Sequence, residues 1–382
     1  MNPYFDKLSA SQELFCPNID CPARGQTGKG NIQVHSQKDQ RCLCNVCGQT
    51  FANTKGTIFY RLRHTPGLVI QVLVLLAHGC PIQAVVKAFG LDERTVRDWH
   101  ARAGKHCQQV HEHLVESTVH DLKQAQADEI KVKTQKGTFW MALAIWVQPR
   151  LWIGGVVSPK RDLDLIQALA DKVKQMALCR PLLLAVDGLA SYVSAFRNAF
   201  RSKFPRQAGE PGRCKMVAWQ NISIVQVVKQ RIGGVLQVER RIAQGAQELV
   251  ERLIQTTQEK GVINTAFIER LNATFRQRIS ALTRRTRNLA QQAETLVASM
   301  YLVGCFYNFC DFHQSLRLKL SVGSFGHRWV QRTPAIAAGL TDHQWTPAEL
   351  FHFRIPLPRW ELPKQRGRPS TAMLQLALQW AN

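Results

Sequence analysis

Two pairs of cysteines near the N-terminus constrain the fold of this chain more than any other feature of its sequence. The chain has eleven cysteines, and five of them precede residue 48. Four of these five form two closely spaced pairs, Cys16 with Cys21 and Cys44 with Cys47. Pairs with this spacing form tight knuckles, and two such knuckles can supply the four thiolates of a structural zinc ion. We therefore expect a zinc ribbon over about residues 12–55.

Two alternatives stay open for this cluster. Cys42 competes with Cys44 as the third ligand, although only Cys44 has the two-residue spacing to Cys47. The cysteines could also be buried free thiols of a small core. A secreted disulfide framework is disfavoured, because the total is odd and the other six cysteines are scattered along the chain.

The net charge indicates the class of partner. Lys and Arg total 50 against 27 Asp and Glu, which gives a net charge of +23. Hydrophobic residues make up 45% of the 382 residues, enough to build folded cores. The longest apolar runs, 68–77 and 139–147, are shorter than the ~20 residues that span a membrane, and no secretory signal precedes them. We expect an intracellular protein that binds a polyanion, most simply nucleic acid.

The segment between residues 65 and 107 has apolar residues at helical spacing. Pro81 begins a second helix there, at the position where a missing N–H costs nothing. Gly90 makes the next turn, and Asp92 can cap a third helix over about residues 93–103. This pattern predicts a helix-turn-helix whose last helix enters the major groove of DNA, although an ordinary helical hairpin has the same pattern. The side chains expected to contact bases are Arg94, Thr95 and Arg97.

The middle of the chain alternates between strand and helix patterns. Three apolar runs have the length of strands: 129–132, 139–147 and 151–157. An amphipathic helix over residues 163–176 follows, and then a fourth strand over residues 182–186. Three hairpin strands, a crossover helix and a further strand are the order of an α/β ribonuclease-H-like core with a mixed sheet.

Three carboxylates stand out in this frame. Asp128 opens the first strand, Asp187 closes the fourth, and Glu269 lies on the polar face of a later helix. Because the first and fourth strands are neighbours in such a sheet, their acids can converge on two divalent ions. One ion would activate a water or a 3′-hydroxyl, and the other would stabilise the leaving oxygen of a phosphodiester. Glu129 should point to the opposite face of the strand, so we expect it to matter less, although it is the main ambiguity.

Arginines follow the third acid. The stretch from residue 270 to residue 287 contains six arginines and no acidic residue. A solvated charged face is the simpler interpretation, but next to a metal-binding acid we expect a groove for the phosphate backbone. The residues assigned to this groove are Arg270, Arg276, Arg278, Arg284 and Arg285.

A second basic segment lies near the C-terminus. Residues 364–369 resemble an AT-hook, in which Arg366 and Arg368 would lie in the minor groove of A·T-rich DNA. A basic linker rich in Pro and Gly is the alternative interpretation.

At these residues the sequence resembles a known family. The segments RCLCNVCGQTF at 41–51 and FIERLNATFRQR at 267–278 are similar to the zinc ribbon and the glutamate helix of prokaryotic DDE transposases of insertion sequences. The closest group is the one similar to insertion sequence one. The resemblance implies strand cleavage and transfer by Asp128, Asp187 and Glu269 with Mg²⁺ or Mn²⁺. One departure is the long gap between the second and third acids, with a strand-rich segment over residues 216–239.

Together, the patterns and the resemblance predict four parts. These are a zinc ribbon (1–56), a helix-turn-helix domain (57–115), a catalytic domain (116–320) and a C-terminal tail (321–382). The resemblance implies binding to double-stranded DNA at element ends and target sites, by a homodimer or a higher synaptic oligomer. The expected location is the prokaryotic cytoplasm at the nucleoid, away from membranes. A catalytically inactive DNA-binding regulator derived from such a transposase is the alternative.

Overall fold

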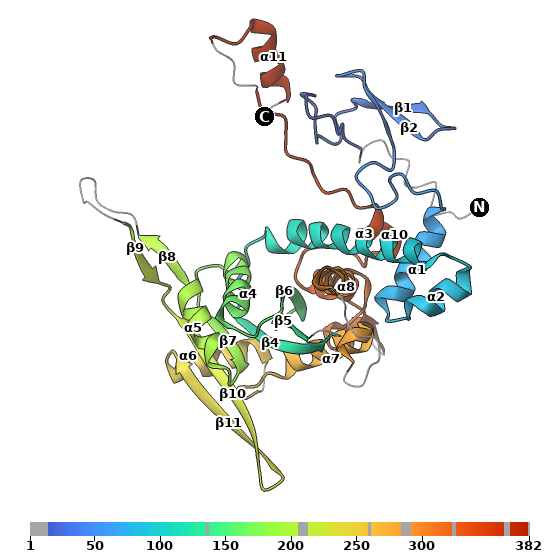
Figure 1. The fold of residues 1–382 in the computed structure, drawn as a ribbon. Coiled ribbons are helices and arrows are strands. Elements are labelled where there is room, and N and C mark those ends of the chain that lie inside the picture. The colour runs from blue at the N-terminus through green and yellow to red at the C-terminus, as the bar shows by residue number, and fades with distance from the viewer. Residues whose placement is uncertain are drawn as a thin grey trace. The chain divides into compact units, whose positions relative to one another are not determined.

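The computed structural model describes residues 14–134, 137–204, 213–258, 261–283, 292–322, 326–362 and 367–380. Over these residues the protein is of the α/β class, and it divides into two compact units (Figure 1). The first unit consists of two segments, the residues up to Pro66 and the residues from His352 onward. The second unit contains residues Gly67–Phe351. Elements of the predicted helix-turn-helix and of the predicted catalytic domain therefore belong to one unit.

The first unit contains a three-stranded antiparallel sheet with its middle strand paired to both neighbours. Its strands are β1 (Ile32–Ser36), β2 (Arg41–Cys44) and β3 (Thr50–Ala52). Alternation along β2 turns Cys42 and Cys44 inward, where they pack with Ile32 and Phe51. The sheet is too small to bury much apolar surface, so a second source of stability is needed.

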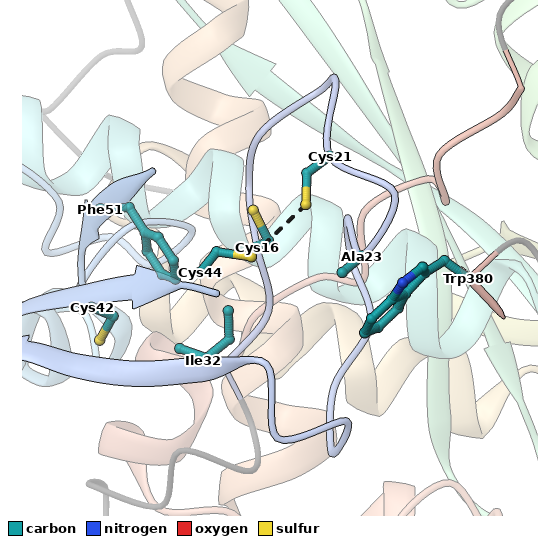
Figure 2. Close-up of a cluster of buried hydrophobic side chains, with 8 residues drawn as sticks. All are labelled: Cys16, Cys21, Ala23, Ile32, Cys42, Cys44, Phe51 and Trp380. Atoms are coloured by element: carbon teal, nitrogen blue, oxygen red, sulfur yellow. Dashed lines mark hydrogen bonds between the residues drawn. The ribbon is translucent and has the colours of Figure 1, made fainter. Parts of the chain in front are cut away.

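A C-terminal helix supplies part of that core. Helix α11 (Thr371–Trp380) places Trp380, 9% exposed, in the same cluster as the buried cysteines, as Figure 2 shows. The backbone oxygen of Trp380 accepts a hydrogen bond from the Gln26 side chain. Gly25, with φ of +69°, admits the Leu357 carbonyl so closely that a Cβ there would lie 2.7 Å from its oxygen. Residues from both parts of the sequence thus build one core.

The second unit begins with the helices predicted between residues 65 and 107. They are α1 (Pro66–Ala77), α2 (Ile82–Phe89) and α3 (Glu93–His111). Gly90 ends α2 with φ of 64°, and the Asp92 carboxylate caps α3 by accepting hydrogen bonds from two backbone N–H groups. The predicted end of α3 at residue 103 is wrong, because its buried stripe continues through Cys107 and Val110.

The extra turns of α3 pack on helix α8 (Ala293–Cys305). Gly104 makes this approach possible, since a Cβ at that position would lie 2.4 Å from the Cα atom of Ala298. One continuous helix therefore carries both the predicted base-contacting side chains and a face buried against the rest of the unit.

Six strands of the second unit form one mixed sheet in the order β11-β10-β7-β4-β5-β6. They are β4 (Gln124–Lys133), β5 (Thr138–Trp146), β6 (Leu151–Ser158), β7 (Leu182–Asp187), β10 (Ile222–Ile232) and β11 (Val235–Gln244). β7 pairs in parallel with both β4 and β10, and the other pairs are antiparallel. The predicted adjacency of the first and fourth strands, β4 and β7, is confirmed.

The start of β4 differs from the prediction. The strand begins at Gln124 rather than at residue 129, so Asp128 lies in its middle and does not open it. The sequence pattern missed this start because Gln124 and Gln126 are polar, yet both are buried with their amides hydrogen-bonded to neighbouring segments. The predicted turn at Gly233 and Gly234 is confirmed, with positive φ at both residues joining β10 to β11.

Helices cover both faces of the sheet. They are α4 (Leu163–Met176), α5 (Ala190–Ala199), α6 (Gln247–Gln258) and α7 (Ala266–Arg278). Alternation along β4 distinguishes the faces: Gln126 and Asp128 bond to residues at α7, whereas Glu129 bonds to Tyr192 of α5. The remaining elements are β8 (Arg201–Phe204), β9 (Lys215–Ala218), β12 (Leu318–Val322), β13 (Gly326–Val330), α9 (Pro334–Ala337) and α10 (Pro347–His352).

One helical segment, Ala293–Leu316, is long and apolar enough to cross a membrane by length and composition alone. Of its most apolar stretch, however, 72% is buried inside the protein. This burial is consistent with the core helix of a soluble protein.

We predict that Trp380→Ala destabilises the first unit, because it removes a large buried side chain from a small core. The expected cost is about 3 kcal/mol, measured as faster hydrogen exchange of the backbone amides in β1, β2 and β3. Leu378→Ala is the matched control, since Leu378 lies on the same helix and is 73% exposed. Equal exchange in both variants would show that α11 does not stabilise the sheet.

Candidate functional site

The candidate site lies where β4 and β7 separate. Their parallel pairing covers only Gln124–Gln126 opposite Leu183–Ala185. Continuing that register by two residues places Asp128 opposite Asp187, the last residue of β7. Backbone hydrogen bonds no longer join the strands there, so polar side chains can occupy the space between them.

Three carboxylates meet at this fork. One oxygen from each of Asp128, Glu129 and Asp187 lies within 4.8 Å of the others. Glu129, which we expected to matter less than Asp128, is thus a member of the same acid group. Its side chain points to the other face of β4, but Asp187 lies past the last paired residues of β4 and β7, where its carboxylate lies near both acids.

Hydrogen bonds fix each of these acids. The Asp128 Oδ2 atom accepts from the Asn272 Nδ2 group at 2.8 Å, and its Oδ1 atom accepts from the Glu129 backbone N–H at 2.9 Å. Glu129 accepts from the Tyr192 hydroxyl at 2.8 Å. The Asp187 Oδ1 atom accepts from the Leu189 backbone N–H at 2.9 Å.

Arg161 is a cation that lies beside these acids. Its guanidinium forms an ion pair with Glu129, and it lies 3.6 Å from the Asp187 Oδ2 atom. The guanidinium also lies over the Trp140 ring, 4.9 Å from its centroid. This stacking fixes the guanidinium beside the acids. Arg161 thus pairs with Glu129 and Asp187, and the charge of Arg276 acts on Asp128.

The shared site raises the proton affinity of its acids. Burial, followed by the charges of Glu129 and Asp187, raises the pKa of Asp128 to about 7. Burial and the Glu129 charge also raise the pKa of Asp187. Near neutral pH the group therefore tends to keep a proton, and a divalent cation bound by these oxygens would replace it.

Glu269 lies outside this group. Its carboxylate forms an ion pair with Lys229 of β10 and accepts a hydrogen bond from the Thr265 hydroxyl at 2.6 Å. Burial alone would raise the pKa of Glu269, but these bonds outweigh burial and lower it. The structure thus brings Asp128 and Asp187 together and leaves the third predicted acid one helical turn before Asn272, paired with a lysine.

Asn272, Arg161 and Tyr192 contact the acids, and none of them was among the predicted site residues. Asn272 is completely buried, although it is a polar residue of α7. Its position, four residues after Ile268 and three before Phe275, matches the spacing of the buried stripe and could have revealed this. Arg161 and Tyr192 come from segments with no local signal of a site.

The four predicted cysteines form a second cluster, in the first unit. One Sγ atom from each of Cys16, Cys21, Cys44 and Cys47 lies within 4.8 Å of the others. The Cys16–Cys47 and Cys21–Cys44 sulfur distances are 3.7 and 3.8 Å. A tetrahedron of Zn–S bonds of about 2.3 Å has edges of about 3.8 Å, so the cluster could bind a metal such as zinc. Cys44 rather than Cys42 belongs to it.

The predicted DNA-contacting side chains have varied environments. Arg94 and Arg97 are exposed on the first turns of α3, and Arg97 forms an ion pair with Glu93, whereas Thr95 is half-buried. Arg270 and Arg368 are exposed, and Arg276 is half-buried. Arg278 forms an ion pair with Asp311. The predicted contacts Arg284, Arg285 and Arg366 lie outside the described residues.

No protein-family model matches this chain, and no curated protein matches it. The resemblance of the motifs to insertion-sequence transposases therefore stays a prediction.

We predict that the free energy of unfolding of Asp128→Asn, relative to that of the wild-type protein, increases as the pH rises. Folded Asp128 keeps its proton up to a pKa of about 7, whereas the unfolded chain loses it near pH 4. The folded state then binds more protons than the unfolded state, so wild-type stability falls between these pH values. Relative to wild type, the variant should gain about 2 kcal/mol of unfolding free energy between pH 5 and pH 8.

The measurement is denaturant unfolding at both pH values in buffer without added divalent cations. Asp171→Asn, at an exposed position of α4, is the control and should show no such gain. A gain for Asp128→Asn that does not change with pH would mean that Asp128 is already ionised at pH 5.

We also predict one zinc ion per chain. Cys44→Ser should lose the metal, because it removes one of four thiolates, whereas Cys42→Ser should keep it. Elemental analysis of protein purified without chelators gives the stoichiometry. Zinc lost from the Cys42 variant but kept by the Cys44 variant would refute this ligand set.

Proposed function

We propose that this protein is a DDE-type DNA transposase of an insertion sequence, similar to the insertion-sequence-one group. It would bind the ends of its element and catalyse metal-dependent cleavage and transfer of DNA strands. The observation that carries the proposal is the meeting of Asp128 and Asp187 at the fork between two parallel strands. The strand order β6-β5-β4-β7-β10, three antiparallel strands followed by two parallel ones, supports a ribonuclease-H-like core.

The residues at the fork suit a divalent cation. Carboxylate oxygens are the ligands that Mg²⁺ and Mn²⁺ prefer. Burial is the main cause of the raised pKa of Asp128, and the charges of Glu129 and Asp187 raise it further. A cation would offset those charges. Asp128 and Asp187 would hold the ion, and a cation bound there supplies activation of a water or a 3′-hydroxyl at a phosphodiester. Glu269 would complete the triad after its carboxylate leaves Lys229.

The rest of the chain offers surfaces for DNA. Arg94 and Arg97 lie exposed at the start of α3, and Arg270 lies exposed one residue after Glu269. With a net charge of +23, the chain favours binding to phosphate backbones. The cysteine cluster would be a structural zinc site that orders a further DNA-binding module. Pairing two element ends requires a homodimer or a higher oligomer, which we propose acts at the nucleoid of a prokaryotic cell.

One observation favours a second candidate. Glu269 bonds to Lys229 and Thr265 and does not join the other acids. A protein that keeps this arrangement would bind DNA without cutting it, as a regulator derived from a transposase.

We predict that Asp128→Asn, Asp187→Asn and Glu269→Gln each reduce strand cleavage by at least ~10³-fold while DNA binding persists. An amide keeps the shape of each acid but removes the charge that holds the ion. The assay uses labelled element-end DNA with Mg²⁺ or Mn²⁺, with binding measured in parallel. Glu248→Gln, exposed on α6, is the control. Cleavage at wild-type rate by the Glu269 variant would remove Glu269 from the catalytic set, whereas no cleavage by the wild-type protein would favour the regulator.

Glu129→Gln serves as an internal comparison in the same assay. The alternation of the strand predicts a mild effect, but the carboxylate of Glu129 belongs to the acid group. We expect an intermediate loss of about 10–100-fold, as for residues that orient metal ligands. A loss as large as that of Asp128→Asn would make Glu129 a ligand itself.

A further inference from the structure

Buried amide side chains fasten helix α7 to strand β4. Gln126, 1% exposed, accepts hydrogen bonds from the backbone N–H groups of Phe267 and Ile268 at 3.1 and 3.0 Å. Its own amide group donates to the Asn264 carbonyl at 2.8 Å. Free N–H groups of the first helical turn are thereby satisfied by a strand residue. This fixes α7 in register with the face of β4 that carries Asp128.

Asn272 makes the next contact along the same helix. It is 0% exposed, and its Nδ2 group donates to the Asp128 Oδ2 atom at 2.8 Å. Its Oδ1 atom is buried and has no hydrogen-bond partner among the described residues. In this orientation the amide nitrogen, which can only donate, faces a carboxyl oxygen of Asp128. An unpaired oxygen therefore lies beside the acid group.

A buried carbonyl oxygen without a partner is costly to keep unless something binds it. The groups at the fork are oxygen atoms of carboxylates, and amide oxygens are also ligands of hard divalent cations. Asn272 and Glu269 both belong to α7. Glu269, the predicted metal ligand of this helix, forms an ion pair with Lys229. The helix thus already places one side-chain amide against Asp128, with the amide oxygen unpaired among the described residues, while its carboxylate is bound elsewhere.

We propose that Asn272 belongs to the divalent-cation site, with its amide nitrogen orienting Asp128 and its amide oxygen joining the ion's oxygen shell, directly or through one water. This inference rests on the proposed function, because it requires a cation at the acids. It adds a neutral ligand to the acid set and assigns separate roles to the two ends of one side chain.

The test is a titration of the full-length, zinc-loaded protein with Mn²⁺ alone, in which free Mn²⁺ is followed by electron paramagnetic resonance at pH 8. Asn272→Leu keeps the volume but removes both polar atoms, and it should weaken Mn²⁺ binding at least tenfold. Asn272→Asp keeps the oxygen and loses the donor, and it should bind within threefold of wild type or more tightly. Asn198→Asp, exposed on α5, is the matched control and should leave the affinity unchanged.

The outcomes separate the possible roles. Weak Mn²⁺ binding in both Asn272 variants would mean that only the donor matters, which overturns the assignment of the oxygen. Unchanged binding in both would overturn the whole inference. The Asp variant has the wild-type shape, so it decides the matter even if the Leu variant fails to fold.

Asp128→Asn distinguishes failure of this inference from failure of the proposed function. Mn²⁺ binding that is lost in Asp128→Asn but intact in both Asn272 variants overturns the role of Asn272 alone. Mn²⁺ binding unaffected by Asp128→Asn overturns the cation site itself, and the inference with it.

Discussion

The short parallel pairing of β4 with β7 determines the rest of the second unit. The strands are hydrogen-bonded over only three residues each, and then they separate. A gap between parallel strands leaves backbone groups and side chains without sheet partners, so polar residues have to fill it. The acids at this fork meet that requirement and create a new one, because three clustered carboxyl groups, one buried and two half-buried, repel one another. Contacts from α5, α7 and the segment before α4 then become necessary to hold them.

Charge compensation at the fork is incomplete. Arg161 offsets part of the negative charge of Glu129 and Asp187, and Lys229 offsets that of Glu269. Among the described residues, the hydrogen-bond donors to Asp128 are neutral: Asn272 and a backbone N–H. The charge of Arg276 lowers the pKa of Asp128, but burial and the neighbouring acids outweigh it and raise that pKa to about 7. A protein selected for stability alone would replace such a group, since clustered like charges cost free energy. Its presence is the physical argument that these side chains serve a ligand.

Local patterns predicted the elements better than the site. The Asp92 cap, the turn at Gly90 and the cysteine pairs depend on neighbouring residues, so the sequence predicts them directly. Asp128 lies within β4 because the strand begins before it, at residues that include Gln126. A polar residue such as Gln126 does not look like a buried strand in the sequence, although its side chain is hydrogen-bonded inside the protein. The grouping of Glu129 with Asp187 depends on where two distant strands part, and no local pattern encodes that point. The Lys229–Glu269 pair likewise joins segments 40 residues apart.

The contact of Trp380 with the cysteine core has a consequence for synthesis of the chain. Gln26 and Trp380 are 354 residues apart, a length that a ribosome translates in roughly 20–70 s at about 5–20 residues per second. During that time Trp380 is absent from the core of the three-stranded sheet, and the side chains that pack with it, the cysteine cluster included, lack this contact. The core of the sheet is thus completed by a helix that is synthesised long after the sheet itself. A ribosome that stops anywhere before residue 380 releases a chain whose first unit is unfinished.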